Sequence, residues 1–98
     1  MLLRHGDLLL KTIATLPKNA KKIHTDTLQE GEVTGHKHRL QGNFEILIQN
    51  DQKFVNAKSQ LELVHEEHNT IQIPIGMYVL VQEREFDIFE QVFQEVRD

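Results

Sequence analysis

Apolar and polar residues alternate in short stretches along most of the chain, and turn-forming residues separate these stretches. The clearest stretches are Leu8–Ile13, Phe44–Ile48, Ser59–His65 and Met77–Gln82, and Gly6-Asp7 is one of the turns. A period of two with Gly, Pro, Asn and Asp between the runs is typical of β-strands. Weaker strand patterns cover residues 23–29, 36–40, 54–55 and 71–73.

The period changes near the C-terminus. Phe86, Phe89, Val92, Phe93 and Val96 follow one another at steps of three and four, with one shorter step within the set. This spacing places them on one face of a helix. The sequence therefore predicts an amphipathic helix over about 86–97, following a series of strands.

Length and composition indicate one small domain. The chain has 98 residues, 39 % of them hydrophobic, and no linker long enough to divide it. Many short strands with turns between them favour a mainly β fold, a small barrel or sandwich over residues 1–98. The absence of cysteine excludes disulfides, thiolate metal sites and cysteine nucleophiles.

The same sequence predicts a cytoplasmic location. The apolar run Leu8–Leu10 is too short for the core of a signal peptide, and no stretch has the apolar length of a membrane span. We expect a bacterial or phage source.

Four of the six histidines form two closely spaced pairs. His36 and His38 are two residues apart, so on a strand both imidazoles point to the same face. His65 and His68 are three apart, and they converge if the residues between them form a turn. Neutral imidazole is a good ligand for transition metals. The pattern predicts that these four residues bind one divalent metal ion, with zinc as the first choice.

Two glutamates lie between the second pair of histidines. If the site is catalytic, Glu66 or Glu67 is the expected base and a metal-bound water the nucleophile; the sequence leaves open whether the protein is an enzyme. Glu32 is a candidate for the outer shell of the first pair. His5 and His24 stand alone and are expected to be ordinary surface histidines. In the alternative without a metal, the pairs are polar strand and loop residues.

The distribution of charge gives two further alternatives. Residues 1–43 carry seven Lys/Arg against four Asp/Glu, whereas residues 44–98 carry four against eleven. A basic surface on the first half would suit a nucleic-acid (RNA) binding module. A third possibility is a small adaptor that binds another protein or a second copy of itself. The nucleic-acid alternative would use Lys18, Lys21, Lys22, Lys37 and Arg39.

Two resemblances concern the histidine segments. Gly31–His38 followed by Pro74-Ile75-Gly76 resembles a reduced cupin pattern, which implies a small metal-binding barrel. The sequence departs from that pattern because no Glu lies three or four residues after His38 and no histidine follows Gly76. The whole run is also similar to small uncharacterised bacterial and phage proteins with a Gly-Glu-x-Thr-Gly-His-x-His segment and a His-Glu-Glu-His segment, here Gly31–His38 and His65–His68.

Overall fold

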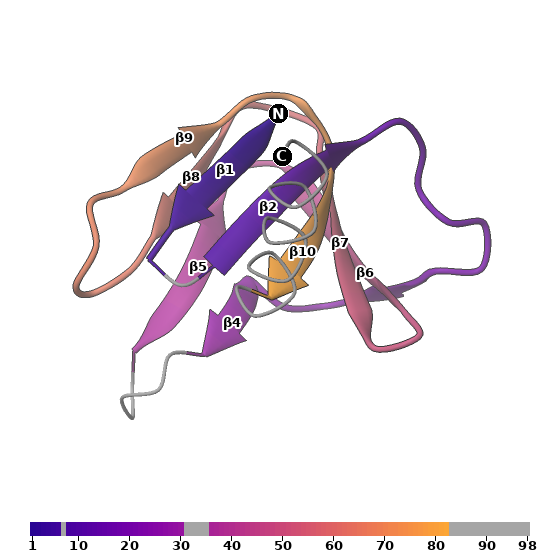
Figure 1. Cartoon of the computed structure of the whole chain (residues 1–98), viewed down its shortest axis with the longest axis horizontal. Helices are drawn as coiled ribbons and strands as arrows, with labels where there is room; N and C mark the ends of the chain where they lie inside the picture. The colour runs from indigo at the N-terminus through magenta and orange to yellow at the C-terminus, as the bar shows by residue number, and fades with distance from the viewer. Residues whose placement is uncertain (7, 31–35, 83–98) are drawn as a thin grey trace, which may run out of the picture.

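The structure is a computed structural model that describes residues 1–6, 8–30 and 36–82, and every strand in this part of the chain pairs antiparallel with its neighbours (Figure 1). The strands are β1 Leu2–His5, β2 Leu8–Ile13, β3 Lys21–Ile23, β4 Thr27–Glu30, β5 Lys37–Gln41, β6 Phe44–Gln49, β7 Gln52–Ala57, β8 Leu61–Val64, β9 Ile71–Ile73 and β10 Gly76–Gln82.

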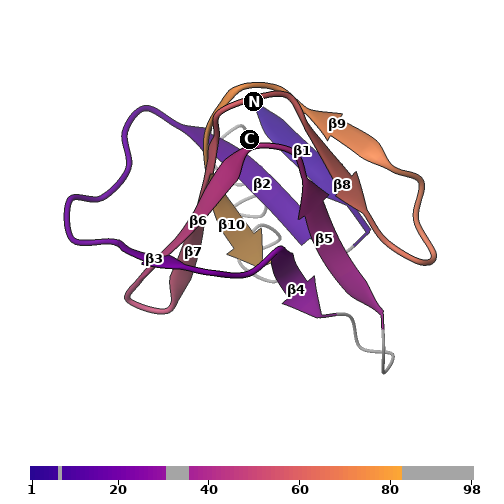
Figure 2. The ribbon, with the colours of Figure 1, turned by 180° about the vertical axis from the view of Figure 1, so that it is seen from behind.

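The strands form two sheets. The larger has the order β1-β2-β10-β7-β6-β3 and the smaller the order β4-β5-β8-β9. Figure 2 shows β5 and β8 lying across β1 and β2, so the smaller sheet covers one face of the larger one. The first strand of the chain thereby comes close to the middle of the second sheet.

One apolar core lies between the two sheets. Leu8 and Leu10 of β2 and Val55 of β7 face Leu40 and Leu63 of the smaller sheet, and all are buried. Because side chains alternate along a strand, Leu9, Leu47 and Phe54 belong to the opposite face of the larger sheet, and they are buried as well. The other buried members of the core are Leu28, Ile46, Ala57, Leu61, Ile73 and Tyr78.

These sheets confirm a mainly β fold and correct part of the expectation. Among the described strands the two sheets do not join into a closed barrel. Of the two expected forms, barrel or sandwich, the barrel is therefore wrong. The segment predicted as one strand over 23–29 is divided by His24, Thr25 and Asp26. Before the break, β3 ends at Ile23 and pairs with β6, and after it β4 begins at Thr27 and pairs with β5. The chain passes to the second sheet at this break. The helix predicted over about 86–97 lies outside the described residues.

Two short turns set the register of the neighbouring strands. Asn50 and Asp51 both have positive φ, 51° and 62°, between the paired residues Gln49 and Gln52. Two such residues in a two-residue loop are the signature of the type I′ hairpin turn. The hairpin of β1 and β2 turns at Gly6, whose φ is 64°. β1 was not among the predicted strands.

The described part of the chain contains no helix that could cross a membrane.

Candidate functional site

The structure brings the two histidine pairs together between the sheets. His38 lies in β5, His36 directly before it, His65 directly after β8, and His68 in the loop that follows. The ring centres of His38 and His65 are 4.4 Å apart, those of His65 and His68 4.5 Å, and those of His36 and His65 5.7 Å. The turn through Glu66 and Glu67 is what allows the second pair to converge.

A fifth histidine belongs to the same cluster. His5, the last residue of β1, is only 3 % exposed, and its Nδ1 lies 2.9 Å from Nδ1 of His38. The expectation of a surface residue was therefore wrong for His5, because its strand was not recognised. The only local signal was its place directly before the Gly6 turn. His24 is exposed on the connection from β3 to β4, as expected. We refer to His5, His36, His38, His65 and His68 as the histidine cluster.

Hydrogen bonds fix the proton positions of the buried rings of His5 and His38. Nε2 of His5 lies 2.8 Å from the backbone oxygen of Asn69, which can only accept, so Nε2 carries the proton. In neutral His5 the Nδ1 atom is then a bare acceptor, and it receives the proton of His38 Nδ1. Burial lowers the pKa of His5 against the weaker opposing effect of the Asn69 bond, and the charges of His68 and His65 lower it further. His5 therefore stays neutral at physiological pH.

The glutamates of the turn have separate partners. Oε2 of Glu66 accepts the backbone N–H of Lys37 at 2.9 Å, and this bond lowers the pKa of Glu66. Oε1 of Glu67 lies 3.3 Å from His36 Nδ1, a nitrogen screened from solvent that has no hydrogen-bond partner among the described residues. The backbone N–H of Glu67 donates to His65 Nδ1 at 3.0 Å. Of the two candidate bases, Glu67 is the one whose carboxylate meets the histidine cluster directly.

Gly6 leaves the space that His68 occupies. A Cβ built on Gly6 would lie 2.3 Å from His68 Nε2, closer than any real contact, and the positive φ of Gly6 also disfavours other residues. The imidazole of His68 therefore packs directly on the backbone of the β1–β2 turn. Gly6 was recognised in the sequence as a turn residue, but its contact with His68 could not be predicted from local pattern.

The residues named for the nucleic-acid alternative are distributed over both sheets. Lys21 and Lys22 are on β3, at the edge of the larger sheet, and Lys18 is on the connection before it. Lys37 and Arg39 are on β5, in the other sheet. Glu32, the proposed outer-shell residue, lies outside the described residues.

In their present side-chain conformations, no three described His, Asp or Glu residues are arranged to hold a metal ion. The cluster is instead a set of packed imidazoles, some of them hydrogen-bonded. The rings of His5, His38, His65 and His68 are nevertheless all mutual neighbours, with centres 4.4 to 6.2 Å apart.

Comparisons with known proteins place the chain in a family. A family model described as "Domain of unknown function (DUF8820)" matches residues 4–83, a range that includes all five histidines of the cluster. No curated protein and no solved structure matches the chain. Membership of an uncharacterised family is thus confirmed, while the two histidine segments as marks of that family, its bacterial or phage source and the cupin likeness stay predictions. Because the match covers well over half of its length, the chain belongs to the DUF8820 family.

Proposed function

We propose that this protein binds one divalent transition metal ion, zinc in the first instance, at the histidine cluster. The observation that carries the proposal is the pair of buried Nδ1 atoms of His5 and His38, which face each other at 2.9 Å. Two ligands of one tetrahedral zinc, each about 2.05 Å from the ion, are about 3.3 Å apart. Small rotations of the two rings would let a metal ion take the place of the proton they share.

The spacing of four rings supports a single four-ligand site. Four imidazoles around one zinc have ring centres about 5 Å apart. The six separations among His5, His38, His65 and His68 range from 4.4 to 6.2 Å around that value. We therefore replace His36 of the sequence-based ligand set by His5, and place His36 outside the ligand shell, beside His65 and Glu67.

Binding requires local rearrangement of the side chains. His65 Nδ1 accepts from Glu67 N–H, so the neutral ring carries its proton on Nε2. That ring must exchange its proton position or turn before it can bind a metal. His68 is exposed, although one side of its ring packs on Gly6, so it can turn toward the ion with less loss of packing than the fully buried His38.

Four protein ligands favour a structural over a catalytic site. Catalytic zinc keeps one position open for water or substrate, whereas structural zinc is closed by four protein ligands. Glu66 is held by the backbone of Lys37, and Glu67 lies beside His36. Neither glutamate is therefore assigned as a catalytic base.

Metal content of protein purified without a histidine tag tests the proposal. Elemental mass spectrometry should find close to one metal ion per chain, or one equivalent of zinc should bind to the metal-free protein in calorimetry. His68→Ala removes an exposed proposed ligand and should abolish stoichiometric binding. His24→Ala, an exposed histidine outside the cluster, is the matched control and should bind normally.

Two further variants decide the ligand set. His36→Ala should retain the metal, and His5→Ala should lose it. The reverse result would restore the set His36, His38, His65 and His68. A folded protein that neither contains metal nor takes up zinc, nickel or copper would overturn the proposal.

A further inference from the structure

The face of the larger sheet that points away from the smaller sheet is apolar. The register pairs Leu9 of β2 with Val81 of β10. It also pairs Phe54 of β7 with Val79 of β10 and with Leu47 of β6. Paired residues, and residues two apart along a strand, point to the same face of a sheet, so these side chains lie together across four strands. We call this the outer face, and its apolar residues are Leu9, Ile13, Leu47, Phe54, Met77, Val79 and Val81.

Part of the outer face is closed to solvent. Leu9 is fully buried, and Phe54 and Leu47 are only 6 % and 8 % exposed. None of the three belongs to the core between the sheets. Figure 1 views this face, with β2 in front of β5, and no other described strand crosses β2 on the viewer's side. The described strands therefore do not explain why these side chains are inaccessible.

The chain that follows β10 has the length and the starting point to cover this face. β10 ends at Gln82, opposite Leu8 and beside Leu9. Residues 83–85 can span up to about 10 Å, enough to turn the chain over the sheet. A helix over 86–97 would be about 18 Å long, and the seven residues of β10 extend about 20 Å. A helix that returns along β10 would therefore match the outer face in length.

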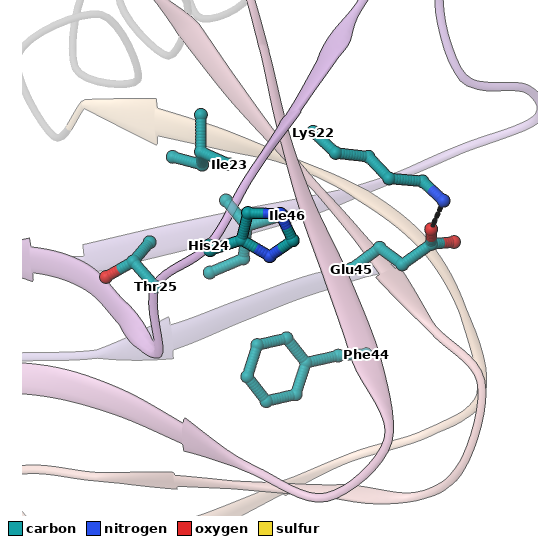
Figure 3. Close-up of a pocket in the computed structure, with 7 residues that line it drawn as sticks. All are labelled: Lys22, Ile23, His24, Thr25, Phe44, Glu45 and Ile46. Carbon is teal, nitrogen blue, oxygen red and sulfur yellow. Dashed lines mark ion pairs between the residues drawn. The ribbon is translucent and has the colours of Figure 1, made fainter.

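Charge also favours this segment as the cover. Residues 83–98 carry six Asp/Glu and two Lys/Arg, so the segment is acidic. Arg4, Lys11 and Lys22 are paired with apolar residues of the outer face and share that face. Figure 3 shows the ion pair of Lys22 and Glu45 on the side of β6 away from the Phe44 ring, which packs on the core. Glu45 is the one carboxylate against three cations among the described strand residues of this face.

We propose that residues 86–97 form an amphipathic helix whose phenylalanine side packs on the outer face of its own chain. The apolar residues at helical spacing supply large side chains for a surface that is itself apolar. The helix would run antiparallel to β10, with its acidic side toward solvent and the basic rim. While it is bound, the outer face is closed to other proteins, so an adaptor function would need another surface. The inference is independent of the metal site. The apolar residues of the helix are Phe86, Phe89, Val92, Phe93 and Val96.

Nuclear magnetic resonance of the full chain tests the contact directly. Cross-relaxation should connect the ring protons of Phe89 and Phe93 with the methyl groups of Leu9 and Val79. The methyl groups of Leu63, in the core between the sheets, should show no such contact and are the internal control. In an equal mixture of isotope-labelled and unlabelled chains, the contacts should arise within one chain. Contacts found only between two chains would overturn the proposal in favour of a second copy on this face.

A pair of double variants tests the same contact by stability. Phe89→Asp with Phe93→Asp places two charges on the apolar side, and it should lower the melting temperature by about 10 °C or more. It should also increase the fluorescence of the dye 8-anilinonaphthalene-1-sulfonate, because the outer face is uncovered. Gln91→Asp with Gln94→Asp adds the same charge on the polar side and is the matched control, with little expected change.

The two measurements keep the proposal open to refutation even where one of them fails. If the phenylalanine variant does not fold, the contacts in the native protein still decide. Absence of contacts between the phenylalanine rings and the outer face would overturn the proposal. Equal loss of stability in the two double variants would overturn it as well, since the effect would then come from charge alone.

Discussion

At the scale of single residues, the histidine cluster depends on a few backbone groups. The Asn69 carbonyl fixes the tautomer of His5, and the Glu67 N–H fixes that of His65. A carbonyl that accepts the ring N–H, as Asn69 does for His5, is the usual second partner of a metal-binding histidine. Two predictions belong to this scale.

The first concerns the contact between Gly6 and His68. Gly6→Ala should destabilise the protein by about 1–2 kcal/mol, because a residue with a Cβ is strained at positive φ, and it should also displace the His68 ring. Gly6→Asn tolerates the backbone angle better but still places a Cβ against the ring. Denaturant unfolding should show a smaller loss for the Asn variant, whereas zinc binding should be equally weak in both. Equal zinc binding by Gly6→Ala and the native protein would contradict this role.

The second concerns pH. The pKa of folded His5 lies below its ordinary value of 6.5, so the unfolded chain binds the proton more readily. The contribution of His5 to the stability of the metal-free protein should therefore be fully present above pH 6.5 and be lost as the pH drops below it. The slope is at most about 1.4 kcal/mol per pH unit for one proton. Thermal melts in the presence of a chelator measure it. A melting temperature that rises between neutral pH and pH 5.5 would contradict the neutral, buried state of His5.

At the scale of elements, the local sequence pattern predicted the strands that have clear turn-forming residues at their ends. β2 has the predicted bounds, and within the predicted strand Ser59–His65 the alternate residues Leu61, Leu63 and His65 are all buried. β1 was missed because its four residues have no turn signal before them. The break in the segment 23–29 was missed because tertiary pairing with two different sheets, rather than local preference, divides it.

The hairpin of β6 and β7 gives a prediction at this scale. Asp51 has φ of 62°, a conformation in which glycine carries no steric cost. Asp51→Gly should match the preferred Asn-Gly type I′ turn and stabilise the protein by up to about 1 kcal/mol. Asp51→Ala should destabilise it by a similar amount. Thermal unfolding of the two variants provides the measurement, and stabilisation by alanine would show that the turn differs from the one described.

At the scale of the whole molecule, the histidine cluster connects the two sheets. The sequence predicted that His36, His38, His65 and His68 would act together, and their convergence could be argued from spacing. The addition of His5 could not, because its partners depend on how β1 lies across β5 and β8 (Figure 2). Such long-range packing leaves no trace in local periodicity.

A metal bound there should stabilise the entire fold. A ligand at a hundred times its dissociation constant adds about 2.7 kcal/mol to the free energy of unfolding, which corresponds to about 10 °C or more for a chain of this size. Zinc should therefore raise the melting temperature, and a chelator should reverse the effect. Magnesium should leave the melting temperature unchanged, because it prefers oxygen ligands. An equal shift in His68→Ala would show that the metal binds elsewhere.

The position of His5 in the chain also bears on the order of folding. It meets His38 33 residues later and the backbone of Asn69 64 residues later. Contacts so distant in sequence form after the local hairpins, because the intervening chain must first be ordered. An unfolded or half-folded chain therefore offers only scattered imidazoles with weak affinity. Metal capture would be the final step of folding, and the slow release of that metal would delay unfolding more than it hastens assembly.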